Sequence, residues 1–214
     1  MTPKAILEII EQARRQEARS GTFLRQLRTK VAALPTTITV AGNRPATRLF
    51  QFAVEYIEMA PRLIEYLDAC AQQSGRRALL SPLIETATRY FTQPSAMLAG
   101  YEGLDGLLSR AYLCHRLIEE MYENNHSTRN SCLVDIEVTQ ANLLAHHLIG
   151  EVFANELDHA ISITALQIAR SPKYSRLNLR PFVGQLENST WDWMRAHWEN
   201  LLVRNHIQFA LNSA

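Results

Sequence analysis

Two histidine–glutamate pairs with the same spacing are the residues best suited to chemistry in this sequence. His115 precedes Glu119 by four positions, and His147 precedes Glu151 by the same interval. Residues four apart share one face of an α-helix, so each pair places an imidazole beside a carboxylate. Such groups suit iron, manganese or zinc, and two carboxylates can bridge two metal ions. The sequence therefore contains the side chains of a candidate metal site.

The two pairs lie on apolar faces of consecutive predicted helices, over residues 104–123 and 139–170. Apolar residues recur at intervals of three and four in both ranges, which is typical of helices packed against a core. A short turn centred near residue 133 would make the helices antiparallel. We then expect His115 to face Glu151 and Glu119 to face His147. All four are predicted metal ligands.

Two interpretations of this cluster stay open. In the first, the cluster binds iron or manganese and draws further carboxylates from Glu55, Glu85 or Asp158. In the second, each histidine hydrogen-bonds the glutamate of the other helix and fixes helix register without a metal. Both satisfy the rule that a buried charge needs a partner.

Two Glu-x-x-His sequences are a second candidate motif, formed by Glu123 with His126 and by Glu156 with His159. This spacing points two ligands inward from one helix in ferritin-like di-iron bundles. Glu156 and His159 lie away from the main apolar face of their predicted helix. We therefore expect a partly exposed pair there rather than a metal centre.

Residues 104–170 resemble the broad group of helical oxidoreductases with carboxylate-bridged metals, ferritin-like or haem-oxygenase-like in architecture. The resemblance rests on the buried His and Glu residues, although His-x-x-x-Glu differs from the ferritin Glu-x-x-His pattern. It implies a metal-dependent, O₂-using oxidoreductase acting on a small apolar molecule inside the bundle. The alternative function is a non-enzymatic helical homodimer that binds a partner or serves a structural role.

The rest of the chain is also predicted to be helical, over residues 3–34, 46–74, 81–92 and 181–211. Ser20-Gly21 should break or bend the first of these helices, and Pro61 should kink the second. Residues 36–40 are the only β-like segment and are expected to form an extended connector. Trp198 is expected in the core. No break in composition divides the chain, so we predict one all-α domain over residues 1–214, a bundle of five to seven helices.

Composition excludes several classes of protein. The 22 Lys and Arg residues nearly balance the 21 Asp and Glu residues, whereas a nucleic-acid-binding surface needs clustered positive charge. The sequence has neither a signal peptide nor an apolar run long enough to cross a membrane. Three cysteines without C-x-x-C spacing favour a reducing, cytoplasmic location. Because the predicted helix over 139–170 is apolar on more than one side, we also expect a homodimer.

Overall fold

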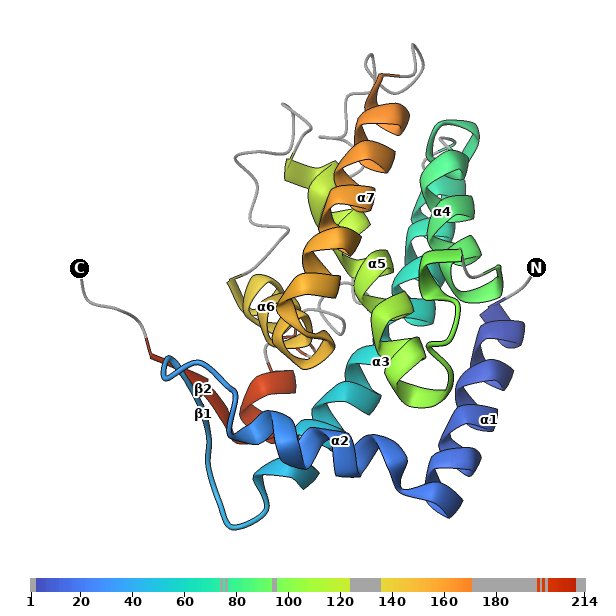
Figure 1. The fold of residues 1–214 in the computed structure, drawn as a ribbon. Helices are drawn as coiled ribbons and strands as arrows, with labels where there is room; N and C mark the ends of the chain where they lie inside the picture. The colour runs from blue at the N-terminus through green and yellow to red at the C-terminus, as the bar shows by residue number, and fades with distance from the viewer. Residues whose placement is uncertain are drawn as a thin grey trace.

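The structure, a computed structural model, describes residues 3–73, 75, 77–93, 96–123 and 136–170 and, near the C-terminus, 196, 198 and 200–210. The described chain is mostly helical and forms a bundle beside one small sheet (Figure 1). The prediction of an all-α fold is confirmed. No helix in these ranges is long and apolar enough to cross a membrane.

In chain order, the helices of the described residues are α1 (Pro3–Ser20), α2 (Thr22–Val31), α3 (Pro45–Gln73), α4 (Arg77–Thr92), a 3-10 turn (Ala96–Leu98), α5 (Gly103–Glu123), α6 (Ile136–Ile149) and α7 (Glu151–Ala169). Residues 200–204 are also helical. The predicted ranges 46–74 and 104–123 agree with α3 and α5 to within one residue at each end, and α3 contains Pro61 as expected.

Two long predicted helices are each divided by a glycine. Gly21 has φ 59° and separates α1 from α2, at the break expected from the sequence. Gly150 has φ 113° and ψ 132° and separates α6 from α7. L side chains rarely adopt positive φ, so glycine permits the chain to turn there. The prediction of one continuous helix over 139–170 is therefore wrong.

The predicted start of α4 is also wrong. This helix begins at Arg77 and includes Pro82, which was expected in its first turn. The Ser81 hydroxyl donates a hydrogen bond to the Arg77 carbonyl oxygen at 2.8 Å. Ser81 therefore bonds within the first turns of the helix instead of preceding it.

A two-stranded sheet joins distant parts of the chain. Strand β1 (Ile38–Val40) pairs antiparallel with β2 (Ile207–Phe209), and Val40 lies opposite Ile207. The extended connector thus has a partner, and the helix predicted to reach residue 211 ends before a turn at Asn205 and His206. The pairing was not predicted, because the residues of each short strand contain no feature that identifies the other strand as its partner.

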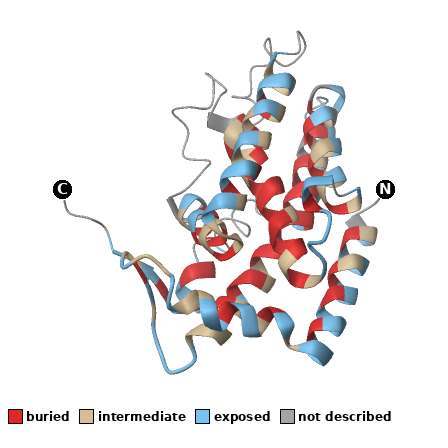
Figure 2. Ribbon diagram, viewed as in Figure 1, coloured by how far each residue is buried: buried red, intermediate tan, exposed pale blue. Residues whose placement is uncertain are grey.

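Helix α5 lies at the centre of the bundle, with α1, α3, α4, α6 and α7 packed around it (Figure 1). Its residues are buried on nearly every side, as the red ribbon of Figure 2 shows. Polar side chains on α5 are therefore taken out of water and require partners inside the protein. Four of them, Tyr112, His115, Arg116 and Glu119, form the candidate site.

Candidate functional site

Glu119 is buried, with 2% of its side chain exposed, and three groups bond its carboxylate. The Thr139 hydroxyl donates to Oε1 at 2.9 Å, and Asn142 Nδ2 donates to Oε2 at 2.6 Å. Arg116, one turn earlier on α5, forms an ion pair with the same carboxylate. The negative charge is therefore both neutralised and hydrogen-bonded within the protein.

The bonds of Glu119 extend into a larger set of polar contacts. The Tyr56 hydroxyl donates to Asn142 Oδ1 at 2.7 Å. The Tyr112 hydroxyl donates to Asp158 Oδ1 at 2.8 Å, and Arg116 Nε lies 3.4 Å from the same oxygen. We call the following seven residues the buried network: Tyr56, Tyr112, Arg116, Glu119, Thr139, Asn142 and Asp158. Thr139 is exposed and Arg116 and Asp158 are partly exposed, whereas the other members are buried. The buried network connects α3, α5, α6 and α7.

Burial keeps both tyrosines of the buried network protonated. Burial raises the pKa of Tyr56 well above its usual value. It also raises the pKa of Tyr112, and the hydrogen bond to Asp158 adds to the effect. A phenol that donates to a carboxylate favours its own protonated form. These hydroxyls are therefore hydrogen-bond donors and not bases at neutral pH.

His115 is buried between aromatic rings. Its ring centre lies 4.5 Å from that of Tyr56 and 4.8 Å from that of Trp198. Its Nε2 is 3.1 Å from the Tyr56 carbonyl oxygen, and its buried Nδ1 has no hydrogen-bond partner among the described residues. Burial lowers the pKa of His115 to about 4. The imidazole is therefore neutral near pH 7 and donates from Nε2. Trp198 is buried, as predicted.

The second His-x-x-x-Glu pair lies where α6 meets α7. His147 is mostly buried, whereas the Glu151 side chain is 73% exposed, and His147 Nδ1 lies 4.0 Å from Glu151 Oε1. Burial lowers the pKa of His147, and the neighbouring His146 lowers it further. Lys30 of α2 donates to the Ile149 carbonyl oxygen at 3.3 Å and so bonds the end of α6.

The structure does not pair the four predicted ligands as expected. His115 contacts the main chain of α3 and not Glu151, and Glu119 bonds α5 and α6 groups other than His147. Contacts between α5 and α6 run in opposite order along the two helices, because Glu119 meets Asn142 while Tyr112, earlier on α5, meets the ring of His146.

Helix α7 runs in the same general direction as α5 (Figure 1). Tyr101, just before α5, stacks on Phe153 at 4.4 Å, and Tyr112 bonds Asp158 further along both segments. The turn at Gly150 thus reverses the chain between the two predicted ligands His147 and Glu151. The antiparallel alignment expected for residue 151 is wrong for this reason.

The side-chain contacts of the described residues do not form a metal site. Among the described residues, no group of three or more His, Cys, Asp or Glu side chains is placed to hold a metal ion. Arg116 occupies the Glu119 carboxylate, and a cation bound there would meet this positive charge. Binding of iron or manganese by His115, Glu119, His147 and Glu151 stays a prediction.

The other candidate ligands lie in separate places. Glu55 forms an ion pair with Arg204 at 2.8 Å. Glu156 and His159 are both exposed on α7, as expected for that pair. Asp158 belongs to the buried network. His126 and the Glu123 side chain lie outside the described residues.

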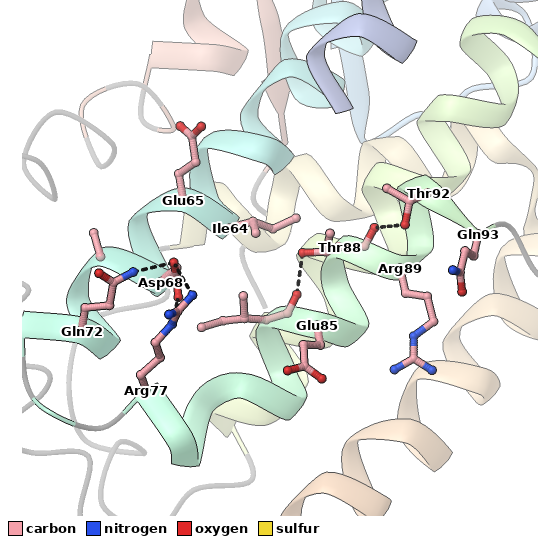
Figure 3. Close-up of a pocket in the computed structure, with 12 residues that line it drawn as sticks. Ile64, Glu65, Asp68, Gln72, Arg77, Glu85, Thr88, Arg89, Thr92 and Gln93 are labelled. Carbon is pink, nitrogen blue, oxygen red and sulfur yellow. Dashed lines mark hydrogen bonds and ion pairs between the residues drawn. The ribbon is translucent and has the colours of Figure 1, made fainter. Parts of the chain in front are cut away.

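Glu85 lines a groove of about 550 Å³ between α3 and α4 (Figure 3). The groove was not predicted, and its walls carry many charged side chains. Arg77 Nε lies 3.0 Å from Asp68 Oδ1, and Gln72 donates to Asp68 at 2.7 Å. Figure 3 shows these three side chains linked at one end while Glu85 and Arg89 extend from α4. A groove with such walls differs from the apolar interior site expected for a small apolar ligand.

Sequence reasoning missed most of the buried network. Asn142 is a polar residue among buried apolar neighbours on α6, and that contrast is a usable signal. Thr139 and Arg116 carry no such signal, because a helix surface commonly contains both residue types. Tyr56 has the helical spacing of a core residue on α3, but the hydrogen bond of its hydroxyl could not be anticipated.

Comparison with known proteins adds no family assignment: no family model, curated protein or solved structure matches this chain. The function therefore has to be argued from the residues themselves.

Proposed function

We propose that this chain is a non-enzymatic helical protein that works as a homodimer, with its buried His and Glu residues serving structure. The observation that carries the proposal is a set of three exposed apolar side chains on one side of α7. Val152, Ile163 and Leu166 are 80%, 45% and 47% exposed. The opposite side of α7 packs into the bundle through Ala154, Leu157, Ile161 and Ala165.

A helix that is apolar on both sides exposes more apolar surface than a peripheral helix of a monomer requires. Leu143 on α6 is also 45% exposed. Val152, Ile163 and Leu166 share one side of α7, and exposed apolar side chains that lie on one surface are typical of protein–protein contacts. A second copy of the chain would remove these side chains from water.

The chemistry of the buried network supports a structural role. Glu119 is already bonded by three donors, and burial raises the pKa of both tyrosines. The Glu119 carboxylate and both tyrosine hydroxyls therefore have hydrogen-bond partners within the protein. A network whose members are satisfied by one another fixes how four helices pack.

The homodimer is tested by light scattering with a matched pair of substitutions. Wild-type protein at tens of micromolar should give twice the 24.3 kDa mass of one chain. Leu166→Asp should shift it to monomer, whereas Leu7→Asp on α1 should not, although Leu7 is equally exposed at 46%. A monomeric wild type, or equal effects of the two substitutions, would contradict the proposal.

The second proposal is the metal-dependent oxidoreductase predicted from the sequence. The observation that favours it is Nδ1 of His115, a buried nitrogen that has no hydrogen-bond partner in the described part of the chain. A neutral imidazole nitrogen is a common metal ligand. Protein expressed with iron and manganese should then contain near-stoichiometric metal, and His115→Gln should lose it while the fold is kept. Metal-free wild type would reject this proposal and leave the homodimer standing.

A further inference from the structure

We propose that the exposed side of α7 forms an antiparallel helix pair with the same helix of a second copy, related by a two-fold axis. This inference rests on the proposed homodimer and specifies its interface. It follows from the spacing of the exposed residues and from the distribution of charge along α7.

The exposed side of α7 contains a row with coiled-coil spacing. We call it the outer row, and its members are Val152, Glu156, His159, Ile163, Leu166 and Arg170. Successive members are separated alternately by four and three positions, the spacing that keeps one seam facing a partner helix. All six are exposed, and exposed residues extend along α7 in Figure 2. The row therefore has the spacing of a helix-pairing surface, with three apolar and three polar members.

Charge along the helix selects the antiparallel arrangement. Glu151 and Glu156 lie in the N-terminal part of α7, and Arg170 follows its last residue. Parallel pairing would place each glutamate beside its own copy and each arginine beside its own copy, which is repulsive. Antiparallel pairing brings the acidic end of one helix to the basic end of the other, and it also opposes the two helix dipoles.

The register is the one in which all six residues of the outer row overlap with the outer row of the second copy. Two antiparallel copies overlap completely when His159 lies opposite Ile163 and Glu156 lies opposite Leu166 of the second copy. Val152 then lies opposite Arg170, which places that arginine beside Glu151 as well. The contact is isologous, so each of these pairings occurs twice across the two-fold axis.

A charge-reversal cycle tests this register. Glu151 and Arg170 lie 19 positions apart, about 28 Å along one helix, so they cannot pair within a chain. We expect Arg170→Glu and Glu151→Arg each to raise the dimer dissociation constant about tenfold, as the loss of two ion pairs and their replacement by repulsion implies. The double variant should return to within about threefold of wild type, because the same two contacts re-form with the charges exchanged. Sedimentation equilibrium measures all four constants, and circular dichroism confirms that each variant is folded.

Disulfide trapping provides an independent measurement of the same geometry. In a Cys70→Ser, Cys132→Ser background, His159→Cys with Ile163→Cys should give a covalent dimer on mild oxidation. The control is Glu11→Cys with Arg15→Cys, an exposed pair with the same spacing on α1, which should not cross-link.

The outcomes separate the inference from the proposed function. A dimeric wild type whose affinity recovers in the double variant, and which is trapped only through α7, supports the antiparallel pair. A dimeric wild type without recovery and without trapping overturns the pair but leaves the homodimer standing. A wild type that stays monomeric at 100 μM, about the upper end of the micromolar range in which a dimer is expected, overturns both.

Discussion

The two His-x-x-x-Glu pairs have the same spacing but lie in opposite environments. His115 and Glu119 are both buried on the central helix, each with 2% exposure. His147 and Glu151 lie at the junction of α6 and α7, where the Glu151 side chain is 73% exposed. Three groups bond the Glu119 carboxylate. By contrast, the nearest charged partner of Glu151 among the described residues is His147, whose Nδ1 lies 4.0 Å from Glu151 Oε1.

The difference shows what spacing can and cannot indicate. An interval of four residues places two side chains on one face of a helix, but it does not say what that face meets. For the first pair the face meets three other helices, and burial then demands compensation of the Glu119 charge by Arg116. For the second pair a change of direction at Gly150 places the glutamate in water.

The largest difference between the pairs should appear when each glutamate is removed. Glu119→Ala leaves Arg116 with only Asp158 at 3.4 Å and Glu120 at 3.7 Å as acidic partners and strands the Asn142 donor, so it should cost about 3 kcal/mol of unfolding free energy. Glu151→Ala should change stability by less than about 0.5 kcal/mol, because its side chain is exposed. Urea unfolding of both variants measures the two values.

A double variant checks the cause of that loss. Arg116→Met combined with Glu119→Leu removes both charges, and it should be more stable than Glu119→Ala because no uncompensated charge stays buried. Similar losses of stability for Glu119→Ala and Glu151→Ala would contradict the conclusion that one pair is buried and the other exposed.

The sequence predicted the fold class and the longest helices because those features are local. The bounds of α3 and α5 follow from repeating apolar residues and from glycines or prolines at their ends. The buried positions of His115 and Glu119 were predicted for the same reason, since both lie on the apolar face of α5. Trp198 was likewise placed in the core from its helical spacing.

Features that depend on distant residues were not predicted. Strand β1 pairs with residues near the other end of the chain, and neither strand contains a signal of this partner. The position of α6 against α5 depends on which side chains bond Glu119, and Asn142 and Thr139 could not be assigned to it beforehand. One glycine, Gly150, decides the direction of α7, although the surrounding residues have helical spacing.

The two histidines should differ in how they link stability to pH. The pKa of His115 is about 4 in the folded protein and about 6.5 when unfolded. The unfolded chain therefore binds the proton first, and stability falls as the pH decreases from about 6.5 to 4. The loss from this one group is about 3 kcal/mol.

This contribution is isolated by comparing wild type with His115→Gln, which keeps a side-chain N–H donor but does not titrate in this range. Urea unfolding at pH 7 and pH 4.5 should show a smaller loss of stability in the variant. His147→Gln should change the slope in the same direction but by less, because burial lowers the pKa of His147 to a smaller extent. Identical pH slopes for wild type and His115→Gln would contradict a buried neutral His115.

Gly150→Ala is expected to change the unfolding free energy by less than Glu119→Ala does. The sign of that change distinguishes a bent chain from one straight helix. If residues 139–170 formed one helix, Gly150→Ala would raise stability by about 1 kcal/mol, because alanine favours a helix interior. The structure gives Gly150 φ 113° and ψ 132°, so we expect a loss of about 1–3 kcal/mol instead. A Cβ atom there would meet only Lys30 Nζ, at 3.7 Å, an ordinary contact, so the loss would come from the backbone. Urea unfolding measures whether Gly150→Ala raises or lowers the unfolding free energy. The control is Glu151→Ala, a substitution at the adjacent position that requires no unusual backbone conformation. Stabilisation by Gly150→Ala would instead indicate one straight helix over residues 139–170. Glu151 would then lie opposite His115, as the sequence predicted.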